Sequence, residues 1–169
     1  MIHIYCGDGK GKTTAAMGQA IRAAGAGLQV LVFQFLKDNS SSERKVLEEV
    51  PGITCLPGRD PVKFVSKMNG DEKAELRHYN NKALDEIVKF CPPFDMLVLD
   101  EALCAIQMNV LSEEKMMSFL QHKPRGLEVV LTGHVVSQDM LDLADYATMM
   151  MKVKHPYDQG KMAREGIEF

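Results

Sequence analysis

The chain has 169 residues, of which 46% are apolar and 25% charged, a balance typical of one soluble globular domain. The net charge of −3 argues against charge-driven binding to nucleic acid or to an anionic membrane. No apolar run reaches the roughly 18 residues of a membrane span. The first residues show no secretion signal, so we expect a cytoplasmic protein. The four cysteines and five histidines lack metal-ligand spacing, which predicts buried, reduced thiols and no zinc site.

Apolar runs of strand length alternate with helical patterns along the chain. The expected strands are residues 2–6, 28–36, 53–56, 95–100, 127–133 and 147–153. The expected helices are residues 12–24 with Gly25 as C-cap, 71–91 ended by Pro92, 113–121 capped by Ser112, and 138–144 capped by Ser137. The polar stretch 37–45 predicts a loop that either contacts a ligand or is simply solvated. This alternation implies a mostly parallel sheet flanked by helices, in a single domain over residues 1–169.

The stretch YCGDGKGKTTAA, residues 5–16, has the features of a phosphate-binding loop that is one residue short. The usual pattern is G-x-x-x-x-G-K-[ST], and Cys6 stands where its first glycine belongs. Glycines let backbone N–H groups converge on anionic oxygens, and the following helix points its positive end at the same spot. The alternatives are a glycine-rich turn with surface lysines and, for Lys10 alone, a surface charge. The predicted triphosphate-binding residues are Gly7, Asp8, Gly9, Lys10, Gly11, Lys12, Thr13 and Thr14, with Lys12, Thr13 and Lys10 as catalytic candidates.

The stretch FDMLVLDE, residues 94–101, is an apolar strand that ends in two acids, as in a Walker-B motif. Such a strand brings a carboxylate to the C-terminal edge of the sheet, beside the phosphate loop. Asp100 and Glu101 are therefore candidate Mg²⁺ ligands together with the Thr13 hydroxyl, unless they are only solvated acids after a strand. The two motifs together predict a P-loop NTPase-like, RecA-like α/β fold.

The sequence resembles the corrinoid adenosyltransferases of the CobA/CobO/BtuR type over nearly its whole length. The shortened loop is itself typical of that family. The matching motifs are GDGKGKTTAA at Gly7, RAAGAG at Arg22, VFQFLK at Val32, VLDE at Val98, LTGH at Leu131, LADY at Leu143, and the tail VKHPYDQGKMAREGIEF from Val153.

The resemblance implies a reaction in which the cobalt of a reduced corrinoid, cob(I)alamin, attacks the ribose C5′ of ATP and the whole triphosphate leaves. Cobalt(I) is already a strong nucleophile, so the protein supplies orientation and a stabilised leaving group. In this family the nucleotide lies across the loop in the reverse sense. The resemblance further implies Mg²⁺, a flavoprotein reductant, a homodimer, and ligand contacts by Arg22, Gln34, Lys37, Phe64, Met68 and His134.

The family prepares the corrinoid with aromatic residues in a Phe-x-Trp stretch, which displace the lower axial ligand of cobalt. Phe64 matches the phenylalanine, but Ser66 stands at the tryptophan position, and Met68 or Tyr79 are the candidates to fill that space. The alternative interpretation of Phe64 is an ordinary core aromatic.

Two further positions depart from the family pattern, because His134 replaces an arginine and Met149 replaces an acid. Histidine cannot form the bidentate fork of arginine. A P-loop ATPase and a non-catalytic ATP- or corrinoid-binding paralogue therefore remain as alternative functions. In the tail, His155, Asp158, Arg164 and Glu165 either contact a nucleotide or partner subunit or belong to the surface of a terminal strand.

Overall fold

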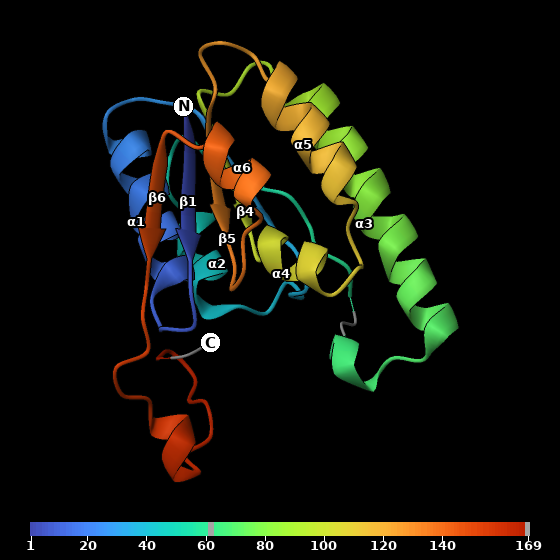
Figure 1. The fold of residues 1–169 in the computed structure, drawn as a ribbon. Helices are drawn as coiled ribbons and strands as arrows, with labels where there is room; N and C mark the ends of the chain where they lie inside the picture. Colours follow the sequence, from blue (N-terminus) through green and yellow to red (C-terminus); the bar gives the residue numbers. More distant parts are fainter. Residues whose placement is uncertain (61–62, 168–169) are drawn as a thin grey trace.

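The computed structural model describes residues 1–60 and 63–167. Its six strands form one sheet in the order β3-β2-β4-β5-β1-β6, and every neighbouring pair is parallel (Figure 1). This confirms the predicted P-loop NTPase-like α/β class. The strands are β1 (Ile2–Cys6), β2 (Val30–Gln34), β3 (Ile53–Cys55), β4 (Met96–Asp100), β5 (Glu128–Thr132) and β6 (Tyr146–Met149). The helices are α1 (Lys12–Gly25), α2 (Ser42–Leu47), α3 (Gly70–Phe90), α4 (Ala102–Gln107), α5 (Glu113–His122) and α6 (Gln138–Leu143), with short 3₁₀ turns η1 (Val65–Lys67) and η2 (Pro156–Gln159).

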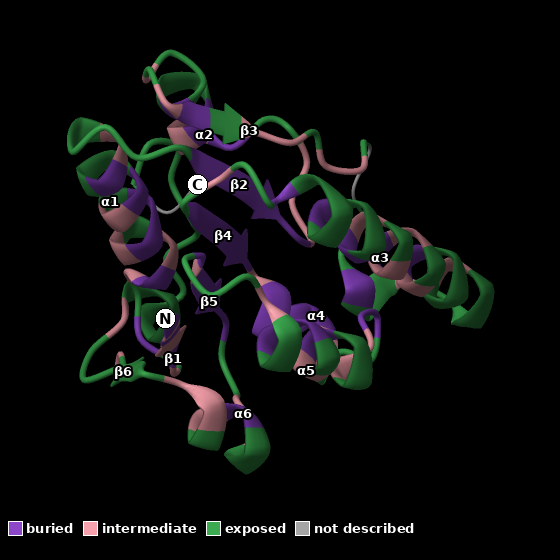
Figure 2. Ribbon diagram, turned by 90° about the horizontal axis from the view of Figure 1, so that it is seen from above, coloured by how far each residue is buried: buried purple, intermediate pink, exposed green. Residues whose placement is uncertain are grey.

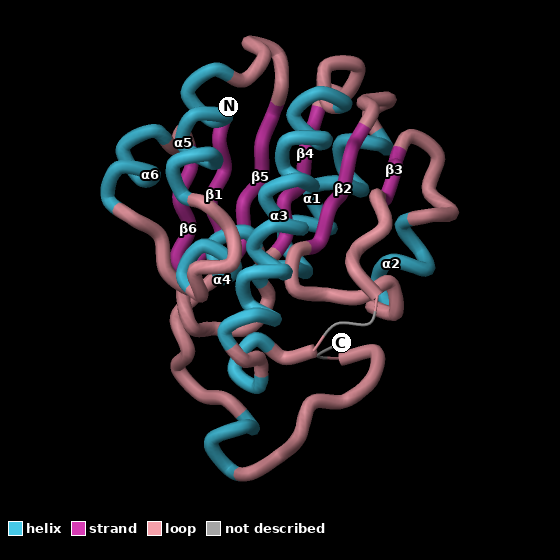
Figure 3. The backbone as a smooth tube through the Cα atoms, turned by 90° about the vertical axis from the view of Figure 1, so that its right-hand side faces the viewer, coloured by secondary structure: helices cyan, strands magenta, loops and turns pink. Residues whose placement is uncertain are grey.

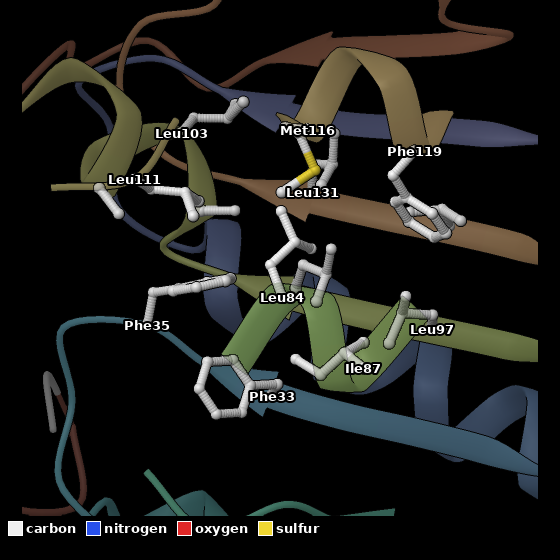
Figure 4. Packing of buried hydrophobic residues seen from close by; sticks show 14 of the residues in the cluster. Phe33, Phe35, Leu84, Ile87, Leu97, Leu103, Leu111, Met116, Phe119 and Leu131 are labelled. Carbon is white, nitrogen blue, oxygen red and sulfur yellow. The ribbon is translucent and has the colours of Figure 1, made fainter. Parts of the chain in front are cut away.

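Helices cover both faces of the sheet, so the core is divided into two layers (Figure 2). Successive side chains of a strand point to opposite faces, and β2 therefore sends Val30 and Val32 toward α1 but Leu31 and Phe33 toward α3. The layer under α3 to α6 is the larger one. Figure 4 shows residues of α3 and α5 packing there against β2, β4 and β5, among them Leu84, Ile87, Met116, Phe119, Phe33, Leu97 and Leu131.

Local signals placed several helix ends correctly. As predicted, the Ser112 and Ser137 hydroxyls accept hydrogen bonds from N–H groups in the first turns of α5 and α6. The cap of α3 was not predicted: Asn69 forms a capping box there with Glu72. The end of α1 differs from the prediction. Gly25 belongs to the helix, and Gly27 takes the left-handed conformation with φ 87° that terminates it.

Several predicted boundaries were wrong. A loop was predicted over residues 37–45, but the chain is helical from Ser42 and forms α2. This helix is held in place because Leu47 is buried and the buried Arg44 guanidinium donates to the carbonyls of Cys55 and Leu56. Strand β2 is shorter than the predicted range 28–36, since Leu36 turns the backbone to a φ of 59°. Helix α4 was not predicted at all.

The last strand was predicted at residues 147–153, whereas β6 ends at Met149 and the chain then leaves the sheet. Residues 150–167, here called the tail, are almost entirely exposed and lie beyond the edge at which the strands end (Figures 1 and 3). That edge also holds the loop between β1 and α1. Within the described part of the chain, no helix has the length and apolar character needed to cross a membrane.

Candidate functional site

The phosphate loop, residues 7–11, joins β1 to α1 and is packed against the first residue of the tail. The Gly7 N–H donates to the His134 carbonyl at 2.9 Å, and the Gly9 N–H donates to the Met150 carbonyl at 2.7 Å. A Cβ atom at Gly7 would collide with the Met150 carbonyl oxygen, and one at Gly9 would lie 2.8 Å from the same atom. Glycine is therefore required at both positions, because the backbone of the tail lies directly behind the loop.

The remaining groups of the loop face a pocket of about 490 Å³. The Lys12 side chain is buried, and its ammonium donates to the Gly9 carbonyl at 2.6 Å. The first N–H groups of a helix have no carbonyl partner within it, so the start of α1 presents donors together with a positive dipole end. The pocket brings together predicted residues from three segments: Asp8, Gly9, Lys10, Gly11, Lys12, Thr13, Thr14, Glu101 and His134.

Asp100 lies behind Thr13 at the end of β4, and its side chain is completely buried. Its Oδ1 accepts from the Thr13 hydroxyl at 2.9 Å and from the Thr132 hydroxyl at 2.7 Å. Its Oδ2 accepts from the Gln34 amide at 3.1 Å and pairs with the Lys37 ammonium at 2.9 Å. The predicted residues Gln34 and Lys37 therefore reach the site through Asp100, whereas Thr132 was not predicted.

Glu43 extends this network and was also not predicted as a site residue. Its carboxylate accepts from the Gln34 amide at 2.8 Å and pairs with the Lys37 ammonium at 3.3 Å. Burial alone would lower the pKa of the Lys37 ammonium. The negative charges of Asp100 and Glu43 have the larger effect, so the pKa of Lys37 lies above its ordinary value. Lys37 is therefore charged at neutral pH and balances the buried Asp100.

Oxygen atoms at this site fit a magnesium ion that is held mainly by phosphate. The described residues contain no group of three or more His, Cys, Asp or Glu side chains that could hold a metal alone. Mg²⁺ in nucleotide sites commonly takes one or two protein ligands and several phosphate or water oxygens. The Thr13 hydroxyl oxygen suits this role, with Asp100 orienting it from behind and Glu101 in the wall of the same pocket.

Glu101 marks the turn from β4 into α4, with a φ of 59° and an N–H that donates to the Thr132 hydroxyl at 2.8 Å. Burial, followed by the negative charge of Glu101, raises the pKa of the Cys104 thiol to about 12. Cys104 therefore stays protonated at neutral pH and is no nucleophile. The prediction of free thiols is confirmed for the four cysteines, of which Cys55 is only half-buried.

The whole chain, residues 1–169, matches the family model described as ATP:corrinoid adenosyltransferase BtuR/CobO/CobP. The chain belongs to this family. The corrinoid adenosyltransferase CobA of Salmonella typhimurium is 32% identical over 173 residues, which cover 100% of this chain and 85% of the relative. The corrinoid adenosyltransferase of Escherichia coli K12 is 31% identical over 169 residues, with 100% of this chain and 85% of the relative covered. That of Pseudomonas aeruginosa is 29% identical over 176 residues, with 98% and 82% covered.

Three ligand contacts expected from the corrinoid adenosyltransferases, Arg22, Phe64 and Met68, lie outside both the phosphate pocket and the hydrogen-bond network of Asp100. Arg22 is exposed near the far end of α1, roughly 15 Å along the helix from Lys12 at 1.5 Å per residue, so the structure does not bring it to the loop. Phe64 is 75% exposed, which excludes the alternative of an ordinary core aromatic. Met68 packs partly buried against the larger core.

Proposed function

We propose that this protein transfers the 5′-deoxyadenosyl group of ATP to the cobalt of a reduced corrinoid and releases triphosphate. The observation that carries the proposal is the family match over the entire chain. The pocket lined by the phosphate loop, Glu101, His134 and the tail supports it, because the loop brings donors and cations together where a triphosphate would lie.

The reaction forms a bond between cobalt(I) and the ribose C5′ and breaks the bond from C5′ to the triphosphate oxygen, which departs with the electron pair. Cobalt(I) brings its own electrons, so no side chain has to act as nucleophile or base. The protein orients C5′ and stabilises the leaving charge. When the triphosphate binds, the Lys12 ammonium gives up its hydrogen bond to the Gly9 carbonyl and donates to a phosphate oxygen instead. The phosphates are surrounded by Lys10, Gly11, Thr13 and Thr14.

We propose Thr13 as the residue that holds Mg²⁺, with Asp100 behind it and Glu101 in the wall of the same pocket. When bound, the ion adds positive charge to the departing triphosphate. Asp100 fixes the Thr13 hydroxyl by accepting its proton in a hydrogen bond, and Lys37 and Gln34 fix Asp100 in turn.

We place the corrinoid over the same edge of the sheet, against Phe64. Helix α3 begins at that edge (Figures 1 and 3), and Phe64 precedes it by a few residues. The exposed ring, with the half-buried Met68 nearby in sequence, is available to displace the lower axial ligand of cobalt. A flavoprotein that supplies the electron, a cytoplasmic location and a homodimeric state complete the proposal.

The test mixes the protein, MgATP and chemically reduced cobalamin and follows the absorbance change that marks the alkylated corrinoid. Triphosphate should appear in equal amount. Absence of adenosylated product under strong reduction would contradict the proposal. Release of orthophosphate without corrinoid would instead identify an ATPase, and tight binding of both ligands without turnover would identify a non-catalytic module.

A further inference from the structure

The pocket beside the phosphate loop has two walls of different chemistry. The wall formed by the loop and the start of α1 carries backbone N–H groups and the Lys10 and Lys12 ammoniums. The second wall belongs to the tail and is lined by Lys152, His155, Tyr157, Asp158, Ala163 and Ile167. The Lys152 ammonium in this wall is neutralised by the Asp158 carboxylate at 2.9 Å, which leaves rings and apolar groups beside the ion pair. A single ligand that satisfies both walls has an anionic end and an aromatic end.

The tail is held against the loop by specific contacts. The Met150 carbonyl accepts from the Gly9 N–H at 2.7 Å, and the Lys152 N–H donates to the Asp8 carboxylate at 2.9 Å. This second bond lowers the pKa of Asp8, so its carboxylate stays ionised and remains an acceptor at neutral pH. The same Lys152 pairs through its ammonium with Asp158 at 2.9 Å, which ties η2 to the loop.

Within η2, His155 orients the turn that carries Tyr157. The His155 Nδ1 accepts from the Tyr157 N–H at 3.2 Å and thereby caps η2. Tyr157 is one of the residues that line the pocket, and it is 70% exposed. An aromatic ring that is anchored through its backbone and open on its surface is suited to stack on a planar ligand.

We propose that Tyr157 stacks on the base of the nucleotide, so that the tail wall holds the nucleoside while the loop wall holds the triphosphate. This inference rests on the proposed function, since it assigns the second half of the same ATP site. It makes Tyr157 a specificity residue: the loop recognises any linked phosphates, and the tail distinguishes a nucleotide from the inorganic chain. Stacking of a base on an aromatic ring commonly strengthens binding about tenfold or more.

The experiment measures the affinities of MgATP and of magnesium triphosphate by calorimetry for the unmodified protein and for Tyr157→Ala, Tyr157→Phe and Met162→Ala. Met162 is the matched control, an exposed tail residue at 80% that does not line the pocket. We expect Tyr157→Ala to weaken ATP about tenfold and to leave triphosphate unchanged, and we expect the other two variants to behave as the unmodified protein. The chain has no tryptophan, so fluorescence of Tyr157→Trp gives a second measurement and should change with ATP but not with triphosphate.

Two results would overturn the inference while the proposed function stands: unchanged ATP affinity in Tyr157→Ala, or an equal loss for ATP and triphosphate. If the unmodified protein forms adenosylated corrinoid in either case, only the role of Tyr157 is wrong. If the unmodified protein binds no ATP, both the inference and the proposed function fail.

Discussion

Asp100 is the residue on which the charge balance of the site depends. It is fully buried, and a buried carboxylate is tolerated only when hydrogen bonds and a counter-ion compensate the lost hydration. Two hydroxyls, one amide and the Lys37 ammonium do so. The same contacts that fix the Thr13 hydroxyl therefore also stabilise the fold.

Lys37→Met should lower the free energy of unfolding by about 2 kcal/mol, because it leaves Asp100 without its counter-ion. The Lys37 side chain is 26% exposed, so water limits the loss. Asp100→Asn removes the charge that needs the ammonium, and the double variant should therefore lose about 1 kcal/mol less than the sum of the single variants. Urea unfolding of the four proteins measures the coupling. Simple additivity would mean that the two residues do not act as a pair.

Lys12 and Lys10 are neighbours in the loop but differ in position, since Lys12 is buried against the loop and Lys10 is exposed. Removal of a group that stabilises the leaving charge commonly costs about 10² to 10³ in rate. We expect that loss in kcat/KM for Lys12→Ala and a loss below about tenfold for Lys10→Ala. Initial rates of adenosylcobalamin formation, measured for the unmodified protein and for both variants, test these two expectations. A Lys12→Ala rate within threefold of the unmodified protein would exclude the proposed role.

Cys104 should resist alkylation in the native protein. Its thiol pKa of about 12 leaves less than about 0.1% thiolate at pH 8.5, and its burial limits access further. Iodoacetamide followed by peptide mass spectrometry should therefore show no label on Cys104 after a treatment that labels it completely in urea. Rapid labelling of the folded protein would contradict both the burial and the raised pKa.

At the scale of elements, the phosphate loop and the tail behave as one unit, and glycine substitutions test this. Gly7 and Gly11 share a φ of 107°, so alanine at either position carries the same left-handed strain of about 1 to 2 kcal/mol. Only Gly7 adds a collision with the Met150 carbonyl, whereas at Gly11 the nearest outside atom is the Met150 sulfur at 3.7 Å.

Gly7→Ala should therefore destabilise the protein by about 2 kcal/mol more than Gly11→Ala and release the tail. The measurements are the urea midpoint and the rate of tryptic cleavage in the tail. Equal stability and equal cleavage of the two variants would show that the tail does not rest on the loop.

The sequence predicted the elements whose signals are local. Ser112 and Ser137 mark helix starts by capping, and the loop glycines with Asp100 mark the candidate site by spacing. It failed where the deciding contact is distant along the chain. The apolar Met149–Met151 run has the composition of a strand, yet β6 ends at Met149, and after it the Met150 carbonyl accepts from the Gly9 N–H and the Lys152 N–H donates to Asp8. Thr132 joins the site in the same way, through Asp100 on the neighbouring strand β4.

At the scale of the whole molecule, the outer strand β6 is an unprotected edge. All four of its residues are exposed (Figure 2). Tyr146 and Met149 are large apolar residues among them. Natural sheets usually protect an edge strand with charge, proline or a covering element. The proposed homodimer provides such cover if the two copies meet along β6.

Met149→Lys should therefore convert the dimer to a monomer, because a charge on an edge strand opposes edge-to-edge pairing. The matched control is Val46→Lys, which places the same charge at a residue of α2 that is 61% exposed, on the other side of the molecule. Sedimentation equilibrium should give a dimer for the unmodified protein and for Val46→Lys and a monomer for Met149→Lys. A dimer that survives Met149→Lys would place the interface elsewhere, and a monomeric unmodified protein would exclude the homodimer altogether.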